Sequence, residues 1–273
     1  MTYINADDAP LAYTGQIKLY GANGFAGMRK AGQIAAAALD MIGEYVKVGV
    51  TTAALDQRIL DFGIDHNAIP ATLNYKGYTH SSCISINHVI CHGIPSDKKL
   101  KNGDILNIDI TYIVDGWHGD SSRMYVAGTP KRLAERLINV TYESLMRGLA
   151  AVKPGATTGD IGHAIQTYVE AERMSVVRDF VGHGLGRLFH DAPSIFHFGE
   201  PGEGETLAEG MIFTIEPMVN IGKPNSKILK DGWTAVTRDR SLSAQYEHSI
   251  GVTKDGYEIF TGSPKGYKCW PYE

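Results

Sequence analysis

Cysteine is scarce in this chain, and its sparse distribution is the first constraint on the class of protein. The 273 residues include three cysteines, Cys83, Cys91 and Cys269, without CxxC spacing. A disulfide framework uses an even set of cysteines, and a zinc finger uses closely spaced pairs. We therefore expect neither, and we expect a reducing, cytoplasmic location.

Long hydrophobic runs and an excess of positive charge are also missing. No run approaches the ~18 apolar residues of a membrane span. The first ten residues, MTYINADDAP, carry acids where a signal peptide carries basic and then apolar residues. The net charge is −4, whereas nucleic-acid binders usually carry a basic patch. We expect no membrane partner and no direct nucleic-acid binding.

The stretch NIDITYIVDGWHGD, residues 107–120, carries the first sign of chemistry. Asp-Gly at 115–116 is a strong signal for a type I′ hairpin turn. Because side chains alternate between faces, a hairpin folded there places Asp109 and Asp120 on one face as diagonal neighbours. The expected register pairs Val114 with Trp117, Thr111 with Asp120, and Asp109 with Ser122.

Two carboxylates on a half-buried face repel each other, and one would have to stay protonated. A divalent cation between Asp109 and Asp120 would remove the repulsion, because hard cations prefer oxygen ligands. The alternative is a pair of ordinary surface acids beside a turn. The hairpin alone leaves both interpretations open.

Apolar periodicity outlines the elements around this hairpin. It predicts a helix over 27–46, a second helix capped by Thr51 or Thr52, and a short strand around 83–86. A third helix is expected after Thr129, with Pro130 at its first position. Residues 1–23 are polar and aperiodic, and we interpret them as an arm lying on the surface.

An internal repeat links the two halves of the chain. The segment VKVGVTT at 46–52 recurs as VKPGATT at 152–158, and GDILNID at 103–109 recurs as GMIFTIE at 210–216. The offsets, 106 and 107 residues, make Glu216 the counterpart of Asp109. Glu247 fits a strand running back beside Glu216. Four carboxylates from two similar halves would then face one cavity, which favours a metal site over surface acids.

Histidines add the imidazole that a catalytic transition-metal site usually contains. The glycine-rich segment GHGLGRLFH holds His183 and His190, and CHGIP holds His92. His118 is expected to face away from Asp120 and lies outside the predicted metal shell. His66, His163 and His197 have no partner motif, so no catalytic role is expected for them, and His80 and His88 remain undecided.

These segments together resemble the type I methionine aminopeptidases of the pita-bread (creatinase/aminopeptidase) metallopeptidase fold. The resemblance spans about 24–262. It implies an α+β fold with two pseudo-symmetric halves, about 24–128 and 129–262, and a curved antiparallel sheet covered by helices. The arm at 1–23 and the tail at 263–273 lie outside it. The segments that carry it are CISINHVICHGIP, NIDIT, DGWHGDSS, GHGLGRLFH, FTIEPM, KDGWT and SAQYEHS.

The resemblance implies a two-metal centre with five protein ligands. Asp109 would chelate one metal, Asp120 and Glu247 would bridge both, and His183 and Glu216 would complete the ligand shell of the second metal. The two divalent ions would be Mn, Fe or Co, and the sequence does not name which. A hydroxide activated between the metals would attack the carbonyl after the first residue.

The resemblance also implies roles for residues beside the metals. Glu216 would move protons between water and the leaving amine, His190 would donate to the developing oxyanion, and His92 would contact the scissile amide. The implied side-chain pocket suits a flexible thioether. The competing interpretation is that its members, Met218 above all, only pack in the core. Those members match Tyr75, Tyr78, Cys83, Phe189, Met218 and Trp233.

The implied function is removal of the initiator methionine from nascent proteins when the second residue is small. The partners would be N-terminal Met peptides, close to the ribosome, and the protein is expected to be a monomer. Lys76 stands where some relatives have a histidine, and Thr79 stands where a proline is frequent. Both departures lie at the expected mouth of the pocket.

Two other functions are considered for this fold. An Xaa-Pro aminopeptidase or prolidase-like enzyme usually carries a separate N-terminal domain, for which this chain has no room. A non-catalytic binding module typically loses metal ligands, and this sequence keeps all five.

Overall fold

The computed structural model describes residues 1–272. Its helices are α1 (Ala22–Ile42), α2 (Thr52–Asp65), α3 (Arg132–Ala150) and α4 (Thr158–Ala171), with short 3-10 turns at Gly43–Tyr45 and Tyr75–Gly77. The strands of the first half are β1 (Tyr3–Asn5), β2 (Ile17–Leu19), β3 (Ile69–Pro70), β4 (Cys83–Ile86), β5 (Val89–Cys91), β6 (Asp104–Val114) and β7 (Trp117–Ala127). Those of the second half are β8 (Ser175–Val176), β9 (Gly182–Gly184), β10 (Asp191–Ile195), β11 (Ile212–Ile215), β12 (Met218–Asn220), β13 (Ser226–Ile228), β14 (Ala235–Thr237), β15 (Ser243–Gln245), β16 (His248–Thr253) and β17 (Gly256–Ile259).

The long hairpin of β6 and β7 has the register predicted from its turn. Val114 pairs with Trp117, Thr111 with Asp120, and Asp109 with Ser122. Asp115 and Gly116 both adopt positive φ, 50° and 79°, as a type I′ turn requires. Asp109 and Asp120 therefore share a face, as the sequence predicts.

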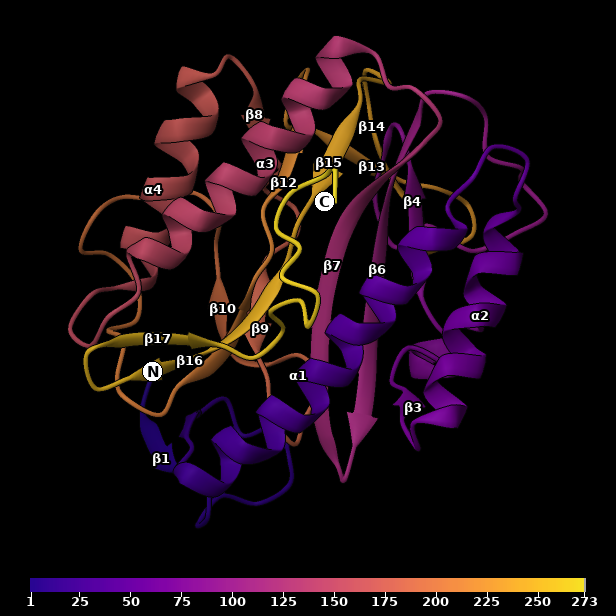
Figure 1. Cartoon of the computed structure of the whole chain (residues 1–273). Helices are drawn as coiled ribbons and strands as arrows, with labels where there is room; N and C mark the ends of the chain where they lie inside the picture. The colour runs from indigo at the N-terminus through magenta and orange to yellow at the C-terminus, as the bar shows by residue number, and fades with distance from the viewer. Residues whose placement is uncertain (273) are drawn as a thin grey trace.

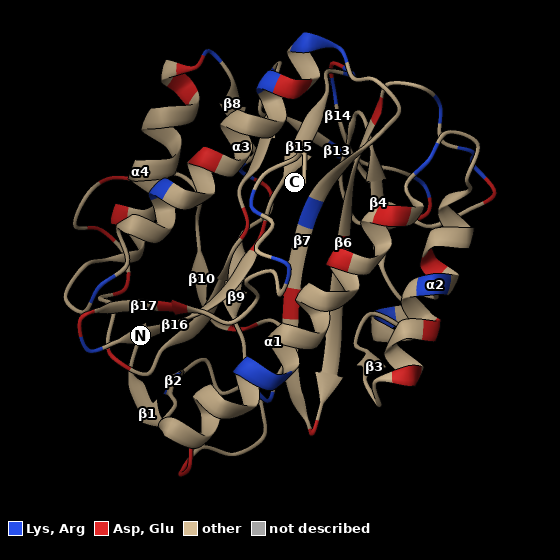
Figure 2. Cartoon of the chain, viewed as in Figure 1, with Lys and Arg blue, Asp and Glu red and all other residues tan. Residues whose placement is uncertain are grey.

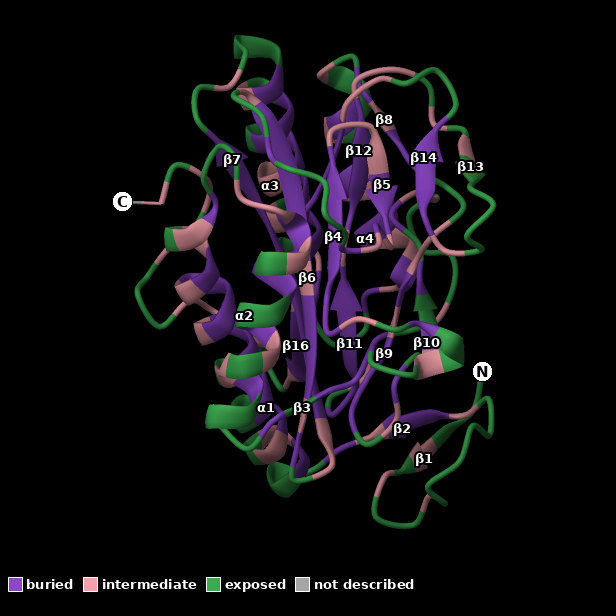
Figure 3. Cartoon of the chain, turned by 90° about the vertical axis from the view of Figure 1, so that its right-hand side faces the viewer, coloured by how far each residue is buried: buried purple, intermediate pink, exposed green. Residues whose placement is uncertain are grey.

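Helices α1 and α2 cover the outer face of β6 and β7 (Figure 1). The buried face of α1 is built largely from alanines, with Met28, Leu39 and Ile42 at no more than 1% exposure. Small side chains let the helix lie close to the sheet. Figure 3 shows the buried strands running through the middle of the molecule, with exposed residues along the outer faces of the helices.

The second half repeats this plan. Helices α3 and α4 pack together and cover strands of the second half (Figure 1). The side chains of Thr51 and Thr157 each accept a backbone N–H from the residue three positions later, so the repeated VGVTT and PGATT segments both contain a helix N-cap. Strand β11 pairs antiparallel with β16, as β6 pairs with β7.

The two halves are joined edge to edge at the predicted acids. Ser122 of β7 forms an isolated bridge with Glu247. The Ser249 hydroxyl donates to the Asp120 carbonyl (2.6 Å), and the Ser121 hydroxyl donates to the Glu247 carbonyl (2.7 Å). These bonds fix the first-half acids against the second-half acids.

Two predicted helix starts are wrong. Helix α3 begins at Arg132 with Lys131 as its N-cap, so Thr129 does not cap it and Pro130 is not its first residue. Helix α1 begins at Ala22, five residues earlier than the apolar stripe indicates, because its first turn lies before that stripe.

The N-terminal arm, expected to cover residues 1–23, is from here on residues 1–21, because α1 begins at Ala22. It forms the parallel pair β1–β2, and Ile17, Lys18 and Tyr20 are buried. The arm is therefore packed into the molecule and does not only lie on its surface.

The C-terminal tail packs against α1 and β7. The buried Asp40 of α1 pairs with Arg123 of β7 and also accepts hydrogen bonds from Ser263 and from the Lys265 backbone N–H. The Tyr272 hydroxyl donates to the Met124 carbonyl at 2.7 Å. The Trp270 backbone N–H donates to the Tyr246 hydroxyl of the second half at 3.1 Å, so the tail contacts both the strand that carries Asp120 and the second half.

Charged residues of both signs alternate along the outer helices and loops (Figure 2). Within residues 1–272, no helix combines the length and the hydrophobicity needed to cross a lipid bilayer.

Gly119 allows the close approach of β7 to α1 beside Asp120. A Cβ at this position would lie 2.3 Å from the Ala31 carbonyl carbon and oxygen, which are backbone atoms and cannot turn aside. We expect Gly119→Ala to lower the free energy of unfolding by about 1–3 kcal/mol, measured by urea denaturation. Gly262→Ala, whose Cβ would meet nothing within 4 Å, should change it by less than ~0.5 kcal/mol. Equal effects of the two variants would show that this contact is not tight.

Candidate metal centre

A cavity of about 340 Å³ opens between the two halves, and every predicted site residue lines it. The metal-ligand candidates come from β7 and β9, from the middle of β6 and from the segments beside β11 and β16. The predicted residues around it are Asp109, Asp120, His183, Glu216, Glu247, His92, His190, Tyr75, Tyr78, Cys83, Phe189, Met218 and Trp233.

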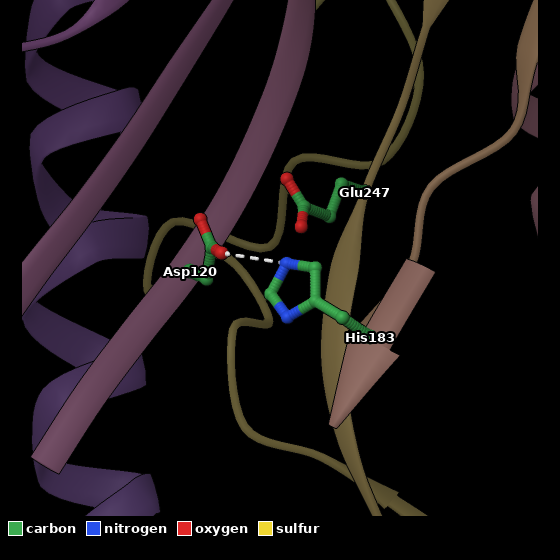
Figure 4. Close-up of side chains that lie close together, drawn as sticks. All are labelled: Asp120, His183 and Glu247. Atoms are coloured by element: carbon green, nitrogen blue, oxygen red, sulfur yellow. Dashed lines mark ion pairs between the residues drawn. The ribbon is translucent and has the colours of Figure 1, made fainter. Parts of the chain in front are cut away.

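The side chains of Asp120, His183 and Glu247 point toward one another across the seam (Figure 4). One ligand atom from each lies within 4.8 Å of the others. His183 Nε2 is 3.6 Å from Asp120 Oδ2 and 3.6 Å from Glu216 Oε1. Residues 31 or more positions apart in sequence therefore present one cluster of imidazole and carboxylate atoms.

Burial raises the pKa values of all four carboxyls, and neighbouring carboxylates raise those of Asp109, Glu216 and Glu247 further. Burial raises the pKa of Asp120 to about 7, against a hydrogen bond from Thr111 that lowers it. The pKa of Asp109 is raised by burial and then by Asp120, and those of Glu216 and Glu247 by burial and the neighbouring carboxylates. The two predicted acids of the hairpin thus repel as expected, and a cation would relieve the repulsion.

The orientation of His183 leaves its Nε2 free to bind a metal. Its Nδ1 lies 3.1 Å from the Gly184 carbonyl oxygen, which requires a proton on Nδ1 and leaves the Nε2 lone pair facing the acids. Burial lowers the pKa of His183 to about 4, so the ring is neutral near pH 7. A neutral imidazole is the form that binds a metal.

Three polar residues that the sequence does not single out orient the acids. The Thr111 hydroxyl donates to Asp120 Oδ1 (2.7 Å), and the Thr214 hydroxyl donates to Glu216 Oε1 (2.8 Å). Gln245 Nε2 donates to Glu216 Oε2 at 3.2 Å. Thr111 was visible in the sequence as the cross-strand partner of Asp120, and Thr214 as the residue two before Glu216 on the same face.

His197 also supports Glu216, although it has no partner motif in the sequence. It is fully buried, and its Nε2 accepts the backbone N–H of Glu216 at 3.0 Å. Burial lowers its pKa to about 3, which keeps Nε2 available as an acceptor. Only the fold brings residues 197 and 216 together.

His190 and His92 lie at the cavity wall. The Tyr75 hydroxyl is 3.0 Å from His190 Nδ1, so the tyrosine can donate to Nδ1 while His190 Nε2 carries a proton. Burial, and then His183, lowers the pKa of His190 to about 2. His92 is packed edge-on against Phe180 and Trp233.

Aromatic and sulfur-containing side chains form an apolar part of the wall. Tyr78 packs edge-on against Trp233 with ring centroids 5.1 Å apart, and Tyr75 packs against Phe189 at 5.0 Å. Cys83 is 5% exposed, and Met218, at 1%, also belongs to a core cluster. Met218 therefore lines the pocket and also packs in the core. Cys91 and Phe180 line the same cavity without having been predicted.

The placement of His118 corrects the sequence interpretation. Strand alternation puts residues 118 and 120 on the same face, and His118 stacks on Phe189 at 5.6 Å with its Nδ1 3.0 Å from the Gly186 carbonyl. It is absent from the cavity lining. It stays outside the predicted ligand set because its ring packs behind Phe189.

The donor set fits a divalent metal. Four buried carboxyls and one neutral imidazole combine hard oxygen ligands with the nitrogen ligand of transition-metal sites. Without positive charge among them, four carboxylates in one buried cluster would be strongly destabilising.

Comparison with known proteins decides the family. The model of metallopeptidase family M24 matches residues 26–254. The chain belongs to this family. The match covers both halves and all five candidate ligands.

Close relatives agree with the resemblance found in the sequence. The chain is 58% identical over 257 residues to a methionine aminopeptidase of Rickettsia prowazekii, covering 94% of this chain and 99% of that protein. It is 54% identical over 236 residues to the methionine aminopeptidase of Escherichia coli, covering 86% of this chain and 89% of that protein.

A solved structure agrees as well. The crystal structure of the Rickettsia prowazekii enzyme superposes with a TM-score of 0.90, over 90% of this chain and 100% of that one. The predicted α+β pita-bread fold and the predicted membership among metal-dependent aminopeptidases are confirmed. The Xaa-Pro and non-catalytic alternatives are not favoured by these matches.

The effect of a chelator on stability should depend on pH. A carboxyl whose pKa is raised on folding, as that of Asp120 is from 3.8 to about 7, contributes stability at low pH that is lost as the pH rises through about 7. We expect the melting temperature of chelator-treated protein to fall between pH 5 and pH 8.

A divalent ion should oppose this fall, because a cation compensates the carboxylates and binds better when its ligands are deprotonated. The gap in melting temperature between Mn-loaded and chelated protein should therefore widen from pH 5 to pH 8. Asp115→Asn, which removes an exposed acid, serves as the control. A gap independent of pH would contradict the assignment of these acids to one metal cluster.

Proposed function

We propose that this protein removes the N-terminal methionine from peptides and newly made chains with a small second residue. The observation that carries the proposal is that all the residues implied by the resemblance line one cavity, in a chain 54–58% identical to methionine aminopeptidases. We also propose that 24–262 acts as one catalytic domain, because both halves supply ligands.

We propose that two divalent metals, Mn, Fe or Co, are held by Asp109, Asp120, His183, Glu216 and Glu247. Such ions supply Lewis acidity and lower the pKa of water, which makes hydrolysis near neutral pH feasible. The side chains that surround the acids keep them in position, and the neutral His183 offers Nε2 to the cluster.

The remaining polar residues act on the substrate. Glu216 transfers a proton to the leaving amine, and its backbone is held by His197. His190 donates from Nε2 to the oxygen of the attacked carbonyl, a role supported by the Tyr75 hydroxyl at its Nδ1. His92 contacts the scissile amide from the opposite wall.

The methionine side chain is proposed to lie among Tyr75, Tyr78, Cys83, Phe189, Met218 and Trp233. Thioethers make favourable contacts with aromatic rings. Asp120 and Glu247 are each 3% exposed, so the scissile bond has to reach the interior. The cavity, with a volume of about 340 Å³, must then hold both the methionyl residue and the side chain of the second residue.

We infer that the substrates are met as new chains leave the ribosome, in the cytoplasm. We further infer that a monomer suffices, because one chain supplies every residue of the proposed site.

Substrate preference tests the activity. Met-Ala-Ser should be cleaved at least ~10-fold faster than Met-Leu-Ser in kcat/KM, because a branched second side chain exceeds the remaining space. Release of free methionine by chromatography measures both. Equal rates, or a preference for an Xaa-Pro peptide, would contradict the proposal.

His190 and His183 can be separated by metal content. His190→Ala should keep both metals and lose about 10²–10³-fold in kcat, because it removes a donor to developing charge. His183→Ala should lose metal first, because it removes a ligand. Metal stoichiometry and kcat are measured on both variants. If His190→Ala loses metal as readily as His183→Ala, the two roles are wrongly assigned; if it keeps full kcat, His190 is not the donor.

A further inference from the structure

The N-terminal arm is fastened to the segment that carries His190. Lys18 Nζ lies 2.5 Å from Asp191 Oδ2, and the two side chains are 6% and 5% exposed. Lys18 Nζ also donates to the Ala12 carbonyl at 3.2 Å, and Asp191 Oδ1 accepts the Ala192 N–H at 2.9 Å. This is a buried ion pair with further hydrogen bonds on both partners, and it links two segments 173 residues apart.

A second contact joins the arm to the residue that precedes His190. The Tyr13 hydroxyl donates to the Phe189 carbonyl oxygen at 2.6 Å. Phe189 precedes His190 and Asp191 follows it, so the arm holds both neighbours of this histidine. The arm reaches no other predicted site residue through the hydrogen bonds of residues 1–272.

The backbone of His190 needs such support. Its φ is +61°, the left-handed region that costs a non-glycine residue of order 1–2 kcal/mol. A residue keeps this conformation only when its surroundings enforce it. At His190 the conformation aims the imidazole at the cavity, with its centroid 4.3 Å from that of His183.

Resting on the role proposed above for His190, we propose that Lys18 and Tyr13 are positioning residues for catalysis: they clamp residues 189–191 so that the His190 imidazole faces the substrate carbonyl. The arm thereby becomes a working part of the active site although none of its side chains enters the cavity. A small displacement of a positioned donor is enough to reduce turnover strongly.

The test compares matched variants of the arm. Tyr13→Phe removes one hydroxyl and should lower kcat on Met-Ala-Ser roughly 3- to 10-fold, with KM and metal content within about 2-fold of the unaltered protein. Lys18→Met should cost up to about 10²-fold. Where Lys18→Met fails to fold, Lys18→Met/Asp191→Asn takes its place, because it leaves no unpaired buried charge.

Two controls lie outside the clamp. Tyr3, in the same arm, donates from its hydroxyl to the Thr206 carbonyl at 2.5 Å, and Lys30 pairs with Asp115 on the surface at 2.6 Å. Tyr3→Phe and Lys30→Met should leave kcat unchanged. Amide hydrogen exchange of metal-free protein gives a readout besides activity: Tyr13→Phe should raise exchange in peptides covering 187–192, and Tyr3→Phe should not.

A double-mutant cycle separates positioning from general stability. In a His190→Ala background, Tyr13→Phe should cause no further loss of kcat, because the group it positions is gone. Losses that multiply, or a Tyr13→Phe variant with full kcat, would overturn the clamp while leaving the role of His190 intact. Full kcat in His190→Ala alone would instead overturn the proposed role of His190 and the clamp with it.

Discussion

The mutual repulsion of four buried carboxyls is the constraint on which the rest of this structure depends. Each is removed from water, and the pKa of each is raised by burial and, for most, by its neighbours. Such a cluster persists only if the surrounding fold is rigid enough to hold it and if positive charge can enter it. Three features provide the rigidity: the hydrogen bonds across the seam, the tight packing of α1 at Gly119, and the tail that contacts β7. The neutral His183, with its lone pair aimed at the acids, serves the second condition.

Polar residues around the cluster share one task, which is to fix the orientation of groups that would otherwise turn away from one another. Thr111, Thr214 and Gln245 direct individual carboxylate oxygens, and His197 holds the backbone of Glu216. Tyr75 does the same for His190. Outer partners of this kind are as necessary to a metal centre as its ligands.

The sequence predicts the centre of this structure better than its margins. The Asp-Gly turn determines the register of β6 and β7, and the internal repeat makes Glu216 the counterpart of Asp109, because both signals act over short distances or by direct comparison. His197 was not identified, since its link to Glu216 depends on a tertiary contact. The start of α3 was misplaced because Thr129 and Pro130 imitate a cap, and the burial of Lys18 was hidden because its partner lies far along the chain. The error at His118 was one of counting, since strand alternation places it with Asp120.

The division of the ligands between the halves has a consequence for the order in which the protein is made. Asp109 and Asp120 are synthesised first, on a hairpin that is complete by residue 127. His183, Glu216 and Glu247 follow only as the second half is translated, and the tail that contacts β7 follows Glu247. Domains generally fold as they emerge, but here the emerging first half carries unmatched acids. A nascent copy of this chain therefore has no complete ligand set until Glu247 of the second half has been synthesised, and the first half alone cannot assemble the metal centre.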